Sequence, residues 1–203
     1  MRVLLLGADG QVGHELRRSL SALGEVVAST QRGQLPDGSA CEAVDFCEPG
    51  ALAALVDRVA PQLVVNAAAY TAVDKAEQEP QLAQRINAEA VVEIAAACAA
   101  RAAMLVHYST DYVFAGDATH PYREDDATGP LGVYGESKLA GERALIESGA
   151  PYRIFRLCWV YGAHGHNFLK TMLRLAGERD ELRVVADQVG TPTPAHWIAD
   201  ATA

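Results

Sequence analysis

A short apolar run followed by three evenly spaced glycines begins the chain, and no other feature restricts its fold as strongly. The run covers residues 1–6, and the glycines have the spacing G-x-x-G-x-x-G. Leucines at helical intervals follow, so the glycines lie between a buried strand and a helix N-terminus. Such a turn lets backbone N–H groups and the positive helix end approach a pyrophosphate. The residues predicted to bind a dinucleotide here are Gly7, Gly10, Gln11, Val12 and Gly13.

Strand-like apolar runs alternate with longer helical stretches along the rest of the chain. This alternation is typical of a parallel sheet that is covered on both faces. We therefore predict an α/β fold, a Rossmann doubly wound parallel sheet with helices on both faces, whose ligands bind beyond the carboxyl ends of the strands. Further strands are expected at residues 43–46, 63–69, 104–108, 152–157 and 182–185, and helices at 49–60, 81–103, from 134, and at 167–176.

The end of the second predicted strand bears on which dinucleotide is bound. This strand, residues 25–32, follows the glycines at the usual distance of about 20 residues, and no carboxylate stands at its end. A carboxylate there would hold the ribose 2′-hydroxyl of NAD. The donors Ser29, Thr30 and Arg32 could instead hold a 2′-phosphate. Arg32 could equally be a solvated loop residue. The sequence favours NADPH, with NADH also possible.

Polar and small residues follow the other predicted strands at the same edge of the sheet. Asp45 could form a hydrogen bond with the adenine and Phe46 could pack against it, although a capping acid and a core aromatic are equally compatible with the pattern. Thr110 could donate to a substrate carbonyl or serve as a turn residue. The small side chains that would let the chain lie against the cofactor are Ala67, Ala68 and Ala69.

A tyrosine and a lysine four residues apart, Tyr134 and Lys138, stand on a predicted helix. Residues at this spacing are neighbours on one helix face. A cation about 4 Å from a phenol favours the phenolate by roughly 1 to 4 kcal/mol, so the sequence predicts that Lys138 lowers the pKa of Tyr134. Such a phenol can exchange a proton with a sugar oxygen beside a nicotinamide. A half-buried ring beside a solvated amine is the alternative.

Composition excludes several classes of protein. No apolar stretch in the 203 residues approaches the length of about 18 that a membrane span needs. The net charge of −9 argues against a nucleic-acid partner. His164 and His166 have no matching ligand cluster, so no metal is expected. The spacing of the four cysteines matches neither a metal-binding motif nor a disulfide scaffold, which indicates a cytoplasmic protein. These cysteines are Cys41, Cys47, Cys98 and Cys158.

Six segments together carry motifs of a known group of enzymes. They are the turn at residues 7–13, VNAAAYTAVDKAE at 65–77, HYSTDYVF at 107–114, YGESKLAGE at 134–142, WVY at 159–161 and DQVGTPT at 187–193. These segments resemble the extended short-chain dehydrogenase/reductase superfamily and, within it, the family of dTDP-4-dehydrorhamnose reductases. Residues 70–77 and 109–114 carry the resemblance to the reductases in particular.

The resemblance implies NADPH-dependent reduction of the C4 keto group of dTDP-4-dehydro-L-rhamnose, a nucleotide sugar, to dTDP-L-rhamnose, and a possible homodimer. Thr110, Tyr134 and Lys138 would be catalytic, and Val73 and Trp159 would surround the sugar together with Thr110 and Tyr134. Members of the family continue well beyond the position of the last residue here. Residues 1–166 are therefore expected to form the NAD(P)-binding domain, and residues 167–203 the start of a substrate-binding lobe that is short relative to the family.

Two other functions share part of this pattern. An epimerase or dehydratase of the same superfamily would have the same glycines and Tyr/Lys pair, but a dehydratase is expected to have Asp-Glu after the threonine, where this chain has Asp111-Tyr112. A non-catalytic, dinucleotide-binding regulatory subunit would need only the glycine turn. The intact set of Thr110, Tyr134 and Lys138 argues against a protein that only binds.

Overall fold

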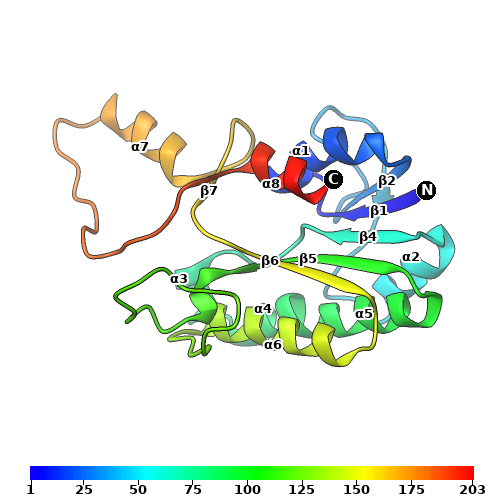
Figure 1. The fold of residues 1–203 in the computed structure, drawn as a ribbon. Helices are drawn as coiled ribbons and strands as arrows, with labels where there is room; N and C mark the ends of the chain where they lie inside the picture. The colour runs from blue at the N-terminus through cyan, green and yellow to red at the C-terminus, as the bar shows by residue number, and fades with distance from the viewer.

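A computed structural model describes residues 1–203, and its main feature is a six-stranded sheet in the order β3-β2-β1-β4-β5-β6. All five neighbouring pairs are parallel. The order reverses between β1 and β4, which is the topological switch point where ligands bind in such sheets. The prediction of a Rossmann doubly wound parallel sheet is confirmed (Figure 1). The strands are β1 (Arg2–Leu6), β2 (Glu25–Thr30), β3 (Glu42–Ala43), β4 (Leu63–Asn66), β5 (Met104–Thr110) and β6 (Tyr152–Leu157).

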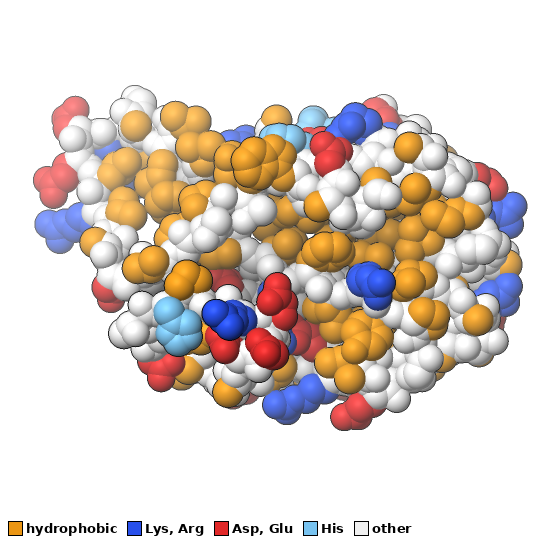
Figure 2. Space-filling model, viewed as in Figure 1, with side chains coloured by type: hydrophobic (Ala, Val, Ile, Leu, Met, Phe, Trp, Pro, Cys, Tyr) orange, Lys and Arg blue, Asp and Glu red, His pale blue; other side chains and the backbone are white.

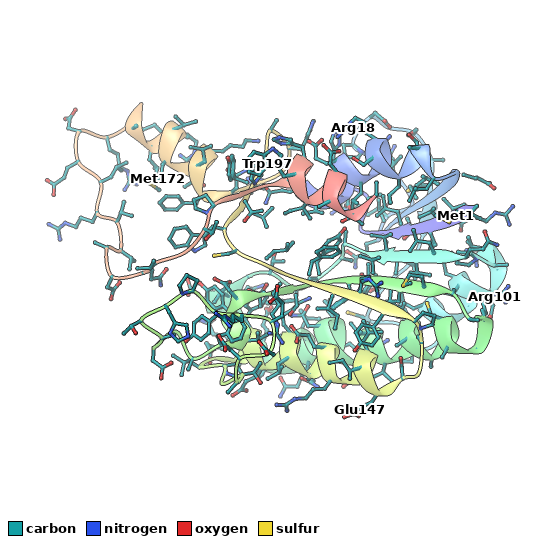
Figure 3. All side chains as sticks on the ribbon, viewed as in Figure 1. Met1, Arg18, Arg101, Glu147, Met172 and Trp197 are labelled. Carbon is teal, nitrogen blue, oxygen red and sulfur yellow. The ribbon has the colours of Figure 1, made fainter.

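Both faces of the sheet are covered by helices, which explains why β1 is a continuous apolar run. Leu4 and Leu6 point into one hydrophobic core, whereas Val3 and Leu5 point into the other, because successive side chains of a strand alternate between faces. Side chains fill the layers between helices and sheet (Figure 3). One face carries α2 (Ala51–Val59), α5 (Ala90–Arg101) and α6 (Val133–Glu147), and the other carries α1 (Gln11–Ser19) and α8 (Ala195–Thr202).

The helix expected at residues 81–103 is interrupted by a π-helical turn, η2 (Arg85–Glu89), between α4 (Pro80–Gln84) and α5. The buried side chain of Asn87 in this turn donates to Ser137 Oγ (3.0 Å) on α6 and to the backbone oxygen of Tyr70 (3.0 Å). At Gly141, α6 lies so close to this turn that a Cβ would be 2.2 Å from the Asn87 oxygen. The π turn therefore fixes the position of α6, the helix that carries Tyr134 and Lys138.

Helix α7 (Phe168–Ala176) stands away from the sheet and has no buried residue (Figure 1). Hydrophobic side chains gather over this part of the surface (Figure 2), including the exposed Phe168 and Leu173 of α7 and Trp197 of α8. The strand predicted at residues 182–185 is not formed, and Val184 and Val185 are exposed. An apolar run becomes a strand only where a sheet edge can pair with it, and no such edge lies beside these residues.

After α7 and the segment that follows it, the chain packs against the sheet again at α8. Helix α8 packs on α1 and contributes Ile198 and Ala199 to the core. The division at residue 167 stays a prediction, but the end of the expected lobe lies against the dinucleotide-binding layer.

No helix has both the length and the apolar character needed to cross a membrane. The remaining short elements are η1 (Leu20–Ala22), α3 (Val73–Ala76), η3 (Asp111–Val113), β7 (Val160–Tyr161) and β8 (Thr193–Pro194).

Candidate functional site

A cavity of about 790 Å³ opens beyond the carboxyl ends of the strands. Its volume is within the range of small-molecule and cofactor sites. The structure brings all the predicted site residues to its wall except Gly13 and Arg32. The predicted residues that line it are Gly7, Gly10, Gln11, Val12, Thr30, Asp45, Phe46, Ala67, Ala68, Ala69, Val73, Thr110, Tyr134, Lys138 and Trp159.

The glycine turn between β1 and α1 needs glycine for two separate reasons. Gly7 has a positive φ of 75°, and a Cβ there would lie 2.7 Å from the backbone nitrogen of Ala68. Gly13, which was predicted to contact the cofactor, does not line the cavity, and a Cβ there would lie 2.0 Å from the Gly7 oxygen. Gly13 therefore lets α1 pack against the turn, so that the helix N-terminus is directed at the cavity.

At the end of β2, the structure does not bring Thr30 and Arg32 together as a phosphate-binding pair. The Thr30 hydroxyl accepts from the Gln34 backbone nitrogen (3.2 Å) and lies 3.1 Å from the Gln34 oxygen, to which it donates. Arg32 does not line the cavity. Besides Thr30, the residues of this strand end that line the cavity are Ser29, whose buried Oγ has no hydrogen-bond partner, and Gln31. Ser29 is one of the donors predicted from the sequence at this strand end, whereas Gln31 was not predicted.

Asp45 does face the cavity beside Gln31, as the sequence predicts. Its carboxylate accepts from the Cys47 backbone nitrogen (2.8 Å) and from Gln31 Nε2 (3.3 Å). The backbone hydrogen bond from Cys47 is the main cause of a lowered pKa for Asp45. A charged carboxylate at this position can accept further hydrogen bonds from a ligand amine or hydroxyl.

Thr110, Tyr134 and Lys138 meet at the end of β5 and the first turns of α6. The Thr110 hydroxyl is near enough to Tyr134 to lower the pKa of its phenol. Thr110 Oγ1 in turn donates to the Asp111 carboxylate (3.1 Å) and accepts from the Tyr112 backbone nitrogen (3.2 Å). The hydroxyls of Thr110 and Tyr134 therefore face the same region of the cavity. Asp111 and Tyr112, which also line it, were not among the predicted site residues.

The structure does not give Tyr134 the lowered pKa that was predicted from its spacing to Lys138. Burial raises the pKa of Tyr134 to about 12, an effect that the nearby Thr110 hydroxyl offsets only in part. The amine of Lys138 is used elsewhere, because Nζ donates to the Tyr108 backbone oxygen (2.7 Å) and lies 3.4 Å from His107 Nε2. The protein's own groups thus keep Tyr134 protonated at neutral pH, which is the state that a proton donor needs.

Lys138 is 2% exposed, and burial lowers its pKa to about 8. In the unfolded chain a lysine has a pKa of ~10.4. Between about pH 8 and 10, Lys138 is therefore protonated in the unfolded state but has lost its proton in the folded state. The free energy of unfolding should therefore rise with pH through this window by about 3 kcal/mol from this residue alone. We expect urea denaturation to show the rise, and Lys138→Met to remove it. If the free energy of unfolding rose equally with pH in the parent protein and in Lys138→Met, the rise would not come from Lys138.

The loop after β7 closes the cavity on the side of the glycine turn. Asn167 Nδ2 donates to Gln11 Oε1 (2.8 Å), and Asn167 Oδ1 accepts from Lys170 N (2.9 Å) to cap α7. Gly165 and His166 line the cavity beside Asn167. No pattern in the sequence indicated this contact, because it joins residues 156 positions apart.

The cavity fits a dinucleotide on its own chemistry. A glycine turn and a helix N-terminus at the switch point suit a pyrophosphate. Ser29 and Ser109 line the cavity with buried hydroxyls that have no partner within the protein, and such groups are normally satisfied by a ligand or water. Together with the half-buried Tyr134 and the buried Lys138 in the cavity wall, this fold and site define a dinucleotide-binding domain of the extended short-chain dehydrogenase/reductase class.

The comparisons with known proteins agree with this class and narrow it. The chain belongs to the family described as RmlD substrate binding domain, whose model matches residues 1–203. It is 52% identical over 203 residues to the dTDP-4-dehydrorhamnose reductase of Shigella flexneri, covering 100% of this chain and 66% of that protein. A relative from Escherichia coli K12 with the same name and coverage is also 52% identical. The chain thus spans about two thirds of the length of the curated relatives that it matches.

Solved structures show the same relationship. The crystal structure of a dTDP-4-dehydrorhamnose reductase from Clostridium acetobutylicum has a TM-score of 0.90 and 39% identity, covering 100% of this chain and 69% of that one. The enzyme of the same name from Bacillus anthracis, solved in complex with NADP, has a TM-score of 0.89 and 37% identity, covering 99% and 68%.

Proposed function

We propose that the protein containing this chain reduces the C4 keto group of dTDP-4-dehydro-L-rhamnose to give dTDP-L-rhamnose, using NADPH, with NADH also possible. The observation that carries the proposal is the meeting of Thr110, Tyr134 and Lys138 in the wall of a cavity at the switch point of the sheet. The names of relatives that are 52% identical to the chain support the choice of substrate. The relative solved with NADP supports the choice of cofactor.

Each residue of this set has a physical task in the reduction. NADPH, when bound, supplies the hydride. Thr110 and Tyr134 present hydroxyls to one region of the cavity and would hold the carbonyl oxygen as it gains negative charge. Tyr134, protonated because of its burial, gives its proton to that oxygen. General-acid assistance of this kind contributes about 10²- to 10⁴-fold.

The other predicted residues bind and orient. Lys138 would hold the ribose hydroxyls next to the nicotinamide, since its amine lies in the cavity wall. Val73 and Trp159 would flank the sugar; both line the cavity, and Trp159 remains 44% exposed. We further propose that the protein is cytoplasmic, in keeping with four free cysteines, and that it forms a homodimer.

The test is to mix the protein with NADPH and dTDP-4-dehydro-L-rhamnose and to follow the absorbance of the reduced nicotinamide. Loss of absorbance only when the sugar is present is the expected result. Tight NADPH binding without any loss would favour the non-catalytic regulatory subunit. Conversion of a nucleotide sugar without net loss of NADPH would favour an epimerase or dehydratase.

A further inference from the structure

Behind the cavity wall, three polar side chains form a buried row from β4 through β5 to α6. Asn66 and His107 are each 1% exposed, and Lys138 is 2% exposed. Asn66 Nδ2 lies 3.2 Å from His107 Nδ1, and His107 Nε2 lies 3.4 Å from Lys138 Nζ. His107 does not line the cavity, so the proposed reduction leaves it without a task. A buried imidazole with two polar neighbours needs a definite tautomer.

The hydrogen bonds determine that tautomer. The backbone N–H of Ala68 donates to Asn66 Oδ1 (3.2 Å), so the amide oxygen faces the backbone and the amide nitrogen faces His107. An amide nitrogen only donates, and His107 Nδ1 must therefore be the unprotonated acceptor. In a neutral ring the proton is then on Nε2, the atom that faces Lys138.

This N–H restricts the charge that Lys138 can carry. A lysine ammonium has three donors and no acceptor, whereas a neutral amine has a lone pair. His107 Nε2–H opposite an ammonium would be one donor facing another, and opposite an amine it forms a hydrogen bond. We propose that His107 is a positioning residue for Lys138: held by Asn66 as the Nε2–H tautomer, it donates to the lysine nitrogen and favours the uncharged amine.

Few other charged or titratable groups lie close enough to Lys138 to affect its protonation. The charged group that faces Lys138 from its own helix is Glu142, which favours the ammonium. The Glu142 carboxylate is itself held by the Arg156 guanidinium of β6 through two hydrogen bonds of 3.0 and 2.7 Å. From β5, the groups that face Lys138 are His107 and the Tyr108 backbone oxygen. His107 is therefore the only titratable group of β5 in hydrogen-bond contact with the amine.

Burial is the main cause of the pKa shifts of both His107 and Lys138. Burial and the Lys138 charge lower the pKa of His107 well below its usual value, so the ring is neutral. Burial lowers the pKa of Lys138 to about 8. The importance of His107 for the reaction rests on the proposed function, in which Lys138 holds the cofactor. By favouring the uncharged amine, His107 would make Lys138 lose its positive charge at a lower pH.

The first measurement reads the tautomer directly in the unmodified chain. Histidine labelled with ¹⁵N should give, for His107, a long-range ¹H–¹⁵N pattern in which Nε2 carries the proton and Nδ1 does not, unchanged between pH 6 and 9. The signal is assigned by its loss in His107→Gln. An Nδ1–H pattern or an imidazolium at His107 would overturn the proposal. No substrate or cofactor is needed, so the outcome is independent of the proposed reduction.

The second measurement follows Lys138 itself. The chain has lysine only at positions 75, 138 and 170, so ¹³Cε-labelled lysine gives three signals to titrate. In His107→Gln the amide oxygen can turn toward the ammonium and accept from it, and we expect the Lys138 midpoint to rise by about one pH unit. His120→Gln, a change at an exposed loop residue, should leave the midpoint unchanged. A midpoint that stays or falls in His107→Gln would contradict the proposal, and the tautomer pattern decides if that variant does not fold.

Discussion

Tyr134→Phe is expected to lower the rate of NADPH-dependent sugar reduction by about 10²- to 10⁴-fold and to leave NADPH affinity nearly unchanged. Phenylalanine preserves the edge-on ring contact with Tyr112, whose centroid lies 5.6 Å from that of Tyr134. It removes only the hydroxyl, the group proposed to give its proton to the sugar oxygen. The measurements are steady-state turnover and a fluorescence titration with NADPH.

Tyr152→Phe is the matched control for this variant. Tyr152 begins β6 at the opposite end of the strand from the cavity and is 36% exposed, so its hydroxyl should not affect turnover. Were Tyr134→Phe to retain full turnover, Tyr134 would not be the proton donor. A collapse of NADPH affinity together with turnover would show instead that the hydroxyl holds the cofactor.

Gly13→Ala is expected to abolish measurable NADPH binding and to lower the free energy of unfolding by about 1 to 3 kcal/mol. The added methyl group would lie 2.0 Å from the Gly7 oxygen, and a backbone atom cannot move aside as a flexible side chain can. Helix α1 must therefore separate from the turn, and its N-terminus would lose its alignment with the cavity. Urea denaturation and the NADPH titration measure the two effects.

Gly177→Ala provides the comparison. Gly177 follows α7 with an ordinary φ of −82°, and a Cβ there would be 3.5 Å from its nearest neighbour, the Arg174 oxygen. We expect stability and NADPH affinity close to those of the parent protein. If Gly13→Ala behaved in the same way, close packing of α1 on the turn would not be what this glycine provides.

The parts of the site that could be predicted from the sequence depend on neighbours along the chain. The turn at Gly7 follows from glycines between an apolar run and a helix, and the shared helix face of Tyr134 and Lys138 follows from their spacing. The strand predicted at residues 182–185 failed for the opposite reason. A strand needs a partner edge, and the local residues carry no information about whether one is nearby.

The sequence by itself determined the class of fold, the edge of the sheet where the cavity lies and about half of the residues that line the cavity. These follow from hydrophobic periodicity and from backbone geometry within single elements. Only the tertiary structure decided that burial raises the pKa of Tyr134 and that Lys138 faces His107 and the Tyr108 oxygen. Desolvation and hydrogen bonding depend on which strands and helices pack together, and such contacts join residues far apart in the chain.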